Sequence, residues 1–253
     1  MLTFTEAQLM QWIGPYMWAF IRILALLSSM PVLSQRVVPA RVKVMLAMLV
    51  AVCAQASLPA MPVVALESSQ AVLLVVQQLL IGISLGFAAR MVFAAVELAG
   101  DTIGLQMGLN FAMFFDPSSG GQVTSLSRFF GAIVTLLFVT INGHLLIMVA
   151  VVQSFHTFPV GPEPFAFLHT LQPQVWGGEI FRLGLWIALP LTAMLLFTNL
   201  VLGVIARVAP QLNVFAIGFP ITVGVGLIGA LFTLPMMQVP FTMALEQMLA
   251  RFQ

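Results

Sequence analysis

The fold is decided around residues 100–121, which read GDTIGLQMGLNFAMFFDPSSGG. Glycines at positions 100, 104 and 108 recur every fourth residue, so they lie along one face of a helix. A methionine- and phenylalanine-rich run follows. The DPSSGG sequence at 116–121 then ends any helix, because proline restricts the residue before it and glycine loosens the chain. A loop this apolar at membrane depth must be buried in protein or line a cavity. We therefore interpret residues 106–121 as a flexible plug in a pore.

The residues assigned to this plug are apolar, sulfur-bearing or aromatic, or they end the helix. They are Gln106, Met107, Gly108, Leu109, Asn110, Phe111, Ala112, Met113, Phe114, Phe115, Asp116, Pro117, Gly120 and Gly121. Methionine and phenylalanine exclude water, and methionine stays deformable, so this composition suits a seal that can move aside. Pro117, Gly120 and Gly121 are predicted to act as its hinges. Ordinary hydrophobic packing of the Met/Phe run is the alternative interpretation.

The composition of the chain is that of an integral membrane protein. Of its 253 residues, 61% are hydrophobic and only 7% are charged, with a mean hydropathy of +1.09. Soluble domains carry about 25% charged residues. The net charge of +1 argues against a nucleic-acid partner. The single cysteine, Cys53, cannot form an intrachain disulfide, and Glu6 before the first apolar run argues against a cleavable signal peptide.

Apolar segments long enough to form helices recur along the chain. They are expected at about 9–30, 42–56, 70 to beyond 96, 124–153, 180–208 and 214–237, with a proline-rich loop at 155–179 and an amphipathic tail at 240–253. If every segment spans a membrane, the loop with Arg36, Arg41 and Lys43 is cytoplasmic by the positive-inside rule, and both termini lie outside. The apolar face of the tail could dock on a partner or lie on the membrane.

Glycines at helical spacing predict close contacts between helices. Gly82 and Gly86 form a GxxxG pattern in the third segment, and Gly100 and Gly104 repeat it further along the same segment. Without side chains at these positions, the backbone of a neighbouring helix can approach closely.

Charged residues inside apolar segments are costly in lipid and are expected to face protein or water. Arg22, in the middle of the first segment, either snorkels to an interface or pairs with a buried acid or carbonyl. Arg90, Glu97 and Asp101 pair with one another or with neighbouring subunits, mark a membrane–water boundary near residue 97, or relay protons. Arg207, which closes the fifth segment, is assigned to the same group of buried or inter-subunit charges.

Catalytic chemistry is not expected. The sequence contains no glycine-rich phosphate loop and no nucleophile elbow. His144, His156 and His169 are too scattered for a zinc, haem or iron–sulfur site. We therefore predict that the chain is not an enzyme and holds no metal or other cofactor.

Residues 31–43, 106–117 and 207–220, in this order, resemble the FliR family of flagellar type III secretion export-gate proteins, and the resemblance covers residues 6–251. It implies an all-α fold of membrane-associated helical hairpins, packed with other subunits in a cone that is partly raised above the membrane plane. It also implies a FliP-like part at 1–180, which contains the plug loop 106–121, followed by a FliQ-like hairpin at 181–253.

The resemblance also implies a function and partners. Such a chain forms a channel with FliP and FliQ, through which unfolded flagellar proteins leave the cytoplasm across the inner membrane at the flagellar basal body. FlhB is expected to wrap the assembly, FlhA to supply the cytoplasmic platform, and membrane lipid to contact the outer helices.

Two alternatives to the export gate stay open. A stand-alone transporter or ion channel would need an ionisable site at the membrane midplane and usually inverted repeats, and the sequence shows no convincing internal repeat. A purely structural scaffold would make the same complex without affecting permeability.

Overall fold

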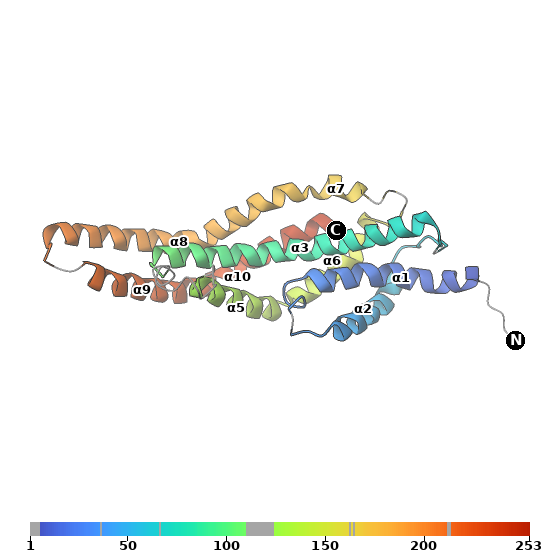
Figure 1. Ribbon diagram of the computed structural model, residues 1–253, viewed down its shortest axis with the longest axis horizontal. Coiled ribbons are helices and arrows are strands. Elements are labelled where there is room, and N and C mark those ends of the chain that lie inside the picture. The colour runs from blue at the N-terminus through green and yellow to red at the C-terminus, as the bar shows by residue number, and fades with distance from the viewer. Residues whose placement is uncertain are drawn as a thin grey trace. The chain divides into compact units, whose positions relative to one another are not determined.

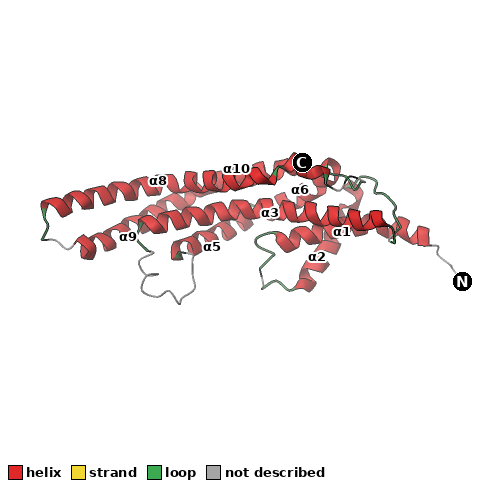
Figure 2. Cartoon of the chain, turned by 45° about the horizontal axis from the view of Figure 1, so that its top comes forward, coloured by secondary structure: helices red, strands yellow, loops and turns green. Residues whose placement is uncertain are grey.

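The computed structural model describes residues 6–35, 37–65, 67–109, 124–161, 163, 165–211 and 214–253. Within these ranges every regular element is a helix, drawn in red in Figure 2. The long apolar runs of the sequence satisfy their backbone hydrogen bonds internally, as segments in an apolar environment must. The predicted all-α fold is therefore confirmed.

The helices follow one another along the chain as labelled in Figure 1. Their bounds are α1 (Glu6–Ser29), α2 (Ala40–Ala54), η1 (Gln55–Ser57), α3 (Ser69–Gln106), α5 (Ser125–Thr140), α6 (Gly143–Thr157), α7 (Ala166–Leu171), α8 (Pro173–Val208), α9 (Val214–Thr233), η3 (Leu234–Met237), α10 (Gln238–Leu249) and η4 (Ala250–Phe252). By length and composition, 5 helical stretches could cross a membrane, or 6 if α5 and α6 count as one broken span. This agrees with the number of apolar segments expected from the sequence.

Two segments differ from the prediction. The helix expected at 124–153 is interrupted after Thr140, and Asn142 takes the left-handed conformation with φ 56°, which asparagine tolerates better than most residues. The loop expected at 155–179 contains α7, and α8 already begins at Pro173. Proline suits the first position of a helix because the N–H that it lacks would have no partner there.

The chain divides into two compact units. The first unit comprises residues 1–91, 142–176 and 245–253, and the second comprises 92–141 and 177–244. Residue 181, the predicted start of the FliQ-like hairpin, lies inside α8. The division into FliP-like and FliQ-like parts stays a prediction.

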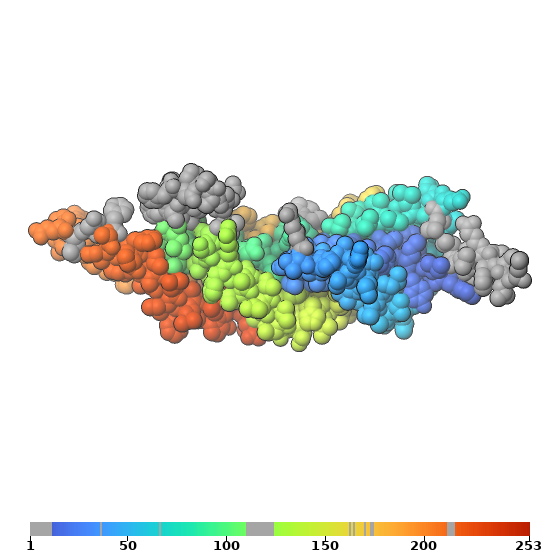
Figure 3. All heavy atoms as spheres, turned by 60° about the horizontal axis from the view of Figure 1, so that its bottom comes forward, coloured from blue at the N-terminus to red at the C-terminus, as the bar shows by residue number. Residues whose placement is uncertain are grey.

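The first unit is built around α1, the first part of α3, and α6. Helices α1 and α2 lie side by side (Figures 1 and 3, blue). Trp18 packs with Ala71 and Leu74. Phe252 of the tail is buried, with its ring centroid 6.4 Å from that of Phe158 and 6.1 Å from that of Trp176. The end of the tail therefore docks on its own chain, which differs from the partner or membrane contact expected from the sequence.

The second unit packs the last part of α3 against α5, α8, α9 and the start of α10. Phe93 of α3 makes edge contacts with Phe138 and Phe241, at centroid distances of 5.4 and 5.6 Å. Helices α8 and α9 run side by side (Figures 1 and 2), and Gly229 lies directly against Leu191.

The helices differ greatly in how much of their apolar surface the chain itself covers. In the α3 stretch, 50% of the residues are buried. The buried share is only 11% in the stretch formed by α2 and η1, and 22% in the α8 stretch. Exposed apolar area on this scale marks contact with lipid or with other proteins.

Candidate functional site

The candidate site is the place in the second unit where the predicted plug leaves α3 and returns at α5. Gln106, Met107, Gly108 and Leu109 lie within the described residues, at the end of α3. The rest of the predicted plug lies outside the described residues: Asn110, Phe111, Ala112, Met113, Phe114, Phe115, Asp116, Pro117, Gly120 and Gly121. The geometry of the site is therefore the geometry of its two attachment points.

The first attachment point is a glycine-capped helix end. Gly108 has φ 78°, a conformation that favours glycine. Its N–H donates to Leu105 O at 3.0 Å, and the N–H of Leu109 donates to Gly104 O at 3.1 Å. This pair of bonds is the Schellman motif, which satisfies carbonyls at the end of a helix. Gly108 therefore ends α3.

Met107 anchors this helix end in the second unit. Its side chain is 1% exposed. A Cβ on Gly226 of α9 would lie 2.5 Å from Met107 Sδ, so the thioether packs directly against the backbone of α9 at this glycine. The hydroxyl of Thr222 contacts Met107 O at 3.4 Å. The end of α3 is therefore held by α9, one residue before its glycine cap.

The second attachment point is Thr124, which caps α5. Its Oγ1 accepts a hydrogen bond from the N–H of Ser127 at 3.1 Å, as a threonine N-cap does. Asp101 Oδ1 accepts from Thr124 Oγ1 at 2.8 Å and from Thr124 N at 3.1 Å. Asp101 therefore bonds to its own chain through Thr124, a partner that was not predicted.

Small residues line the seam between α3 and α5. A Cβ on Gly100 would lie 2.7 Å from Ser127 Cα, and a Cβ on Gly104 would lie 3.0 Å from Thr124 Oγ1. Ser127 Oγ also donates to Glu97 O at 2.8 Å. The two helix backbones therefore approach closely at both predicted packing glycines of this unit.

The other pair of predicted packing glycines lies in the first unit. A Cβ on Gly82 would run into Arg22 O of α1, and a Cβ on Gly86 would run into Ser29 Oγ. Helix α3 thus carries one glycine pair in each unit, and each pair faces a different helix.

Arg22 lies at the centre of the first unit and is completely buried. Its Nη1 donates to Ser154 O at 2.8 Å and to Ser154 Oγ at 3.0 Å, and its Nη2 donates to Phe158 O at 2.8 Å. Its Nε donates to Gln78 Oε1 at 2.7 Å. The guanidinium carbon lies 3.7 Å from the ring centroid of Phe155. Arg22 therefore joins α1 and α3 to the carbonyl end of α6.

The remaining predicted charges lie at the surface of the described chain. Arg90 and Glu97 of α3 are exposed. Arg207 is also exposed and lies in the last turn of α8, where a cation is favoured by the helix dipole.

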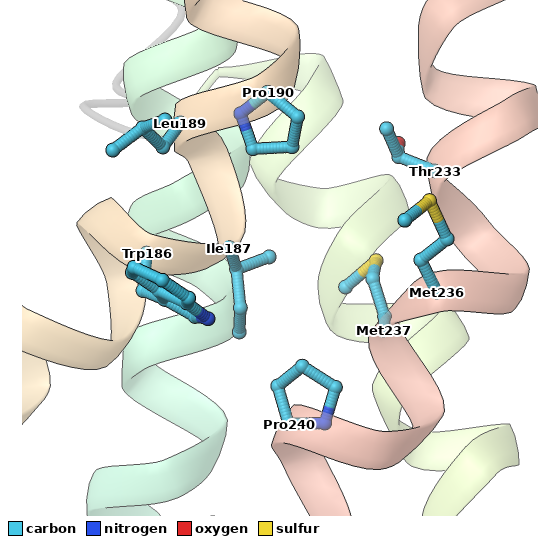
Figure 4. A pocket seen from close by; sticks show the side chains of 8 residues that line it. All are labelled: Trp186, Ile187, Leu189, Pro190, Thr233, Met236, Met237 and Pro240. Carbon is cyan, nitrogen blue, oxygen red and sulfur yellow. The ribbon is translucent and has the colours of Figure 1, made fainter.

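An apolar pocket of about 230 Å³ lies in the second unit beside Pro190 (Figure 4). Proline has no N–H, so the carbonyl of Trp186, one turn earlier, lacks its usual helical donor. The lining residues come from α8 and from the break between α9 and α10: Trp186, Ile187, Leu189, Pro190, Thr233, Met236, Met237 and Pro240. None of these described side chains carries a charge.

Part of this site had no usable signal in the sequence. The capping role of Thr124 could have been found, because a threonine begins the predicted segment and threonine is a favoured N-cap residue. The contacts of Arg22 could not, because Gln78 and Ser154 lie 56 and 132 residues away along the chain.

These features define the class of protein: a polytopic helical membrane protein whose apolar outer faces are largely uncovered by its own chain. The chain belongs to the family of bacterial export proteins, family 1, whose model matches residues 13–248.

Three relatives illustrate how far the similarity extends. Flagellar biosynthetic protein FliR of Escherichia coli K12 is 48% identical over 236 residues, covering 92% of this chain and 90% of that protein. FliR of Pectobacterium carotovorum is 42% identical over 236 residues, covering 93% and 90%. FliR of Aquifex aeolicus is 33% identical over 224 residues, covering 87% and 85%. The resemblance predicted from the sequence is confirmed.

Proposed function

We propose that the chain is a structural and gating subunit of the flagellar type III protein export channel, which passes unfolded flagellar proteins across the bacterial inner membrane at the flagellar basal body. The family match supports the export role, and the FliR relatives support the flagellar one. The chain assembles with FliP and FliQ in a helical cone, as a FliP-like part at 1–180 joined to a FliQ-like hairpin at 181–253. FlhB and FlhA are its further partners.

The observation that carries the gating role is that the residues on both sides of a Met/Phe-rich stretch are held by hydrogen bonds and packing. The last turn of α3 is held by the Gly108 cap and the Met107 contact with α9. The first turn of α5 is held by Asp101 through Thr124. A seal for a pore that passes unfolded chains must exclude water and ions yet deform, and methionine and phenylalanine provide both properties.

Removal of the stretch tests this role. Residues 110–121 are replaced by a short Gly-Ser linker, which keeps both attachment points, and the variant is expressed together with FliP and FliQ. The leak of small ions across the membrane is expected to rise several-fold, while the three proteins still purify as a complex. An unchanged leak through a fully assembled complex contradicts the plug.

A matched control changes the same residue types elsewhere. Met45 and Met48 on the exposed face of α2 are replaced by serine. These substitutions leave the attachment points intact, so the ion leak is expected to stay at the level of the unchanged protein.

The alternative, a stand-alone transporter or ion channel, is less well supported. Such a protein needs an ionisable site inside the membrane. In the described part of the chain, the charged side chain that is buried is Arg22, and it bonds to carbonyl, hydroxyl and amide oxygens. A transporter is expected to be stable when purified alone, whereas a gate subunit is expected to require FliP and FliQ.

A further inference from the structure

We propose that Asp101 is a positioning residue for the plug: its carboxylate clamps the start of α5 to α3 and so keeps the pore sealed. This inference rests on the proposed gating function and names what regulates it. The 101–124 clamp, as we call it, consists of Asp101 Oδ1 with the backbone N–H and the hydroxyl of Thr124.

The clamp is a chain of hydrogen bonds in which the threonine hydroxyl is used in both directions. Thr124 Oγ1 donates to Asp101 Oδ1 at 2.8 Å and accepts from Ser127 N at 3.1 Å. Thr124 is 7% exposed, so water competes little for these bonds. Bonds to an ionised carboxylate are shorter and stronger than those between neutral groups.

The charge of Asp101 also suits its place. It lies at the N-terminus of α5, where unpaired N–H groups favour a negative charge. Asp101 therefore caps a helix other than its own, and the cap ties that helix to α3.

The glycine of the seam makes the clamp possible. A Cβ on Gly104 would lie 3.0 Å from Thr124 Oγ1 and 3.2 Å from Thr124 Cβ. A side chain at this position would require Thr124 to shift by about a few tenths of an ångström. The glycine and the carboxylate thus act on the same residue, one by making room and the other by binding.

The clamp fixes the distance between the two ends of the plug. Leu109 is fixed by the glycine cap and Met107, and Thr124 is fixed by Asp101. When the clamp is removed, Thr124 loses its bonds to α3, while Ser127 still donates to Glu97 O one turn further into α5. The end of the plug at Thr124 can then shift, and the seal is expected to leak even though the plug residues are unchanged.

Substitutions of graded severity test the clamp in the assembled complex with FliP and FliQ. Asp101→Ala removes both bonds and is expected to raise the ion leak several-fold. Thr124→Val removes the hydroxyl and keeps the backbone bond, so a smaller rise is expected. Asp101→Asn keeps an oxygen that can accept both bonds but loses the charge, so a smaller rise than that of Asp101→Ala is expected. Thr124→Ser keeps the hydroxyl and should stay near the unchanged protein. Glu246→Ala, which removes an exposed carboxylate of α10, is the control.

A disulfide rescue separates positioning from general damage. Asp101→Ala is combined with Gly104→Cys and Thr124→Cys in a Cys53→Ala background, because Cys53 is exposed and would otherwise react. The Cβ separation of 3.2 Å at 104 and 124 is below the roughly 3.5–4.5 Å of a disulfide, so the two positions must move apart by about a few tenths of an ångström for the bond to form. The reduced complex is expected to leak, and oxidation is expected to restore the seal. A formed disulfide that leaves the leak unchanged overturns the inference.

The plug deletion distinguishes failure of this inference from failure of the proposed function. If the deletion leaks but Asp101→Ala in an assembled complex does not, the clamp has no role in sealing. If the deletion does not leak, the plug itself is excluded, and the clamp with it.

Discussion

Arg22 in the first unit and the 101–124 clamp in the second unit each bind the end of a helix, and they do so with opposite charges. Arg22 donates to Ser154 O and Phe158 O, at the carbonyl end of α6. Asp101 accepts at the N–H end of α5. Each charge matches the sign that the helix dipole favours. Each cap lies within its own unit: an anion from α3 caps the start of α5 in the second unit, and a cation from α1 caps the end of α6 in the first.

The two regions differ in how many buried hydrogen bonds are lost when the charged residue is replaced. Arg22 is fully buried and uses four hydrogen bonds, so its loss leaves several polar groups without partners. Asp101 is half-buried and acts on a single residue. The first centre therefore determines stability, whereas the second adjusts the position of one helix end.

The largest effect is expected from Arg22→Leu. The loss of Arg22 leaves the buried oxygens of Gln78, Ser154 and Phe158 without this donor, and each unsatisfied group costs about 1–3 kcal/mol of unfolding free energy. Arg22→Lys should rescue little, because a lysine cannot reach three partners with a planar fork. Arg90→Leu, at an exposed position of α3, is the control. Thermal unfolding of the purified complex measures the loss. An unfolding midpoint for Arg22→Leu equal to that of the control would contradict the claim that Arg22 determines stability.

A smaller effect is expected from the glycine seams. Gly82→Ala places a Cβ against Arg22 O, and Gly100→Ala places one 2.7 Å from Ser127 Cα. In both cases the added Cβ meets a backbone atom, which cannot easily move aside, so we expect the free energy of unfolding to fall by about 1–3 kcal/mol. Gly203→Ala is the matched control, because nothing lies within 4 Å of its Cβ in this chain. It should stabilise α8 by about 0.5–1 kcal/mol.

Thermal unfolding and ion leak, measured on the same two variants, together distinguish the roles of the two units. We expect Gly82→Ala to lower the unfolding midpoint without a leak, because it acts beside Arg22. We expect Gly100→Ala to do both, because it acts at the seam of the clamp. Equal leaks from the two variants contradict the division of roles.

The sequence predicts the elements of this fold better than their interruptions. Long apolar runs indicate helices whatever their packing, so α1, α3 and α8 are found. The break at Asn142 is missed, although Asn142-Gly143 is a turn signal, because long apolar runs on either side dominate the hydropathy of the segment. Hydropathy averages over a window and does not register one left-handed residue.

The candidate site was predictable only in part for a related reason. Glycine spacing identifies where helices approach, since it depends on local periodicity. Which helix approaches depends on tertiary contacts: Gly82 faces α1, and Gly100 faces α5. Asp101 was recognised as an unusual charge, but its partner Thr124 lies 23 residues away, across the predicted plug.

The most direct measurement of the central claim is a crosslink from the plug itself. A photoreactive amino acid is placed at Phe114 in the complex with FliP and FliQ, with and without an export substrate trapped in the channel. We expect crosslinks to the channel subunits in the empty complex, and their replacement by crosslinks to the substrate when it is trapped. Crosslinks to lipid alone, unchanged by the substrate, would contradict a seal in the pore.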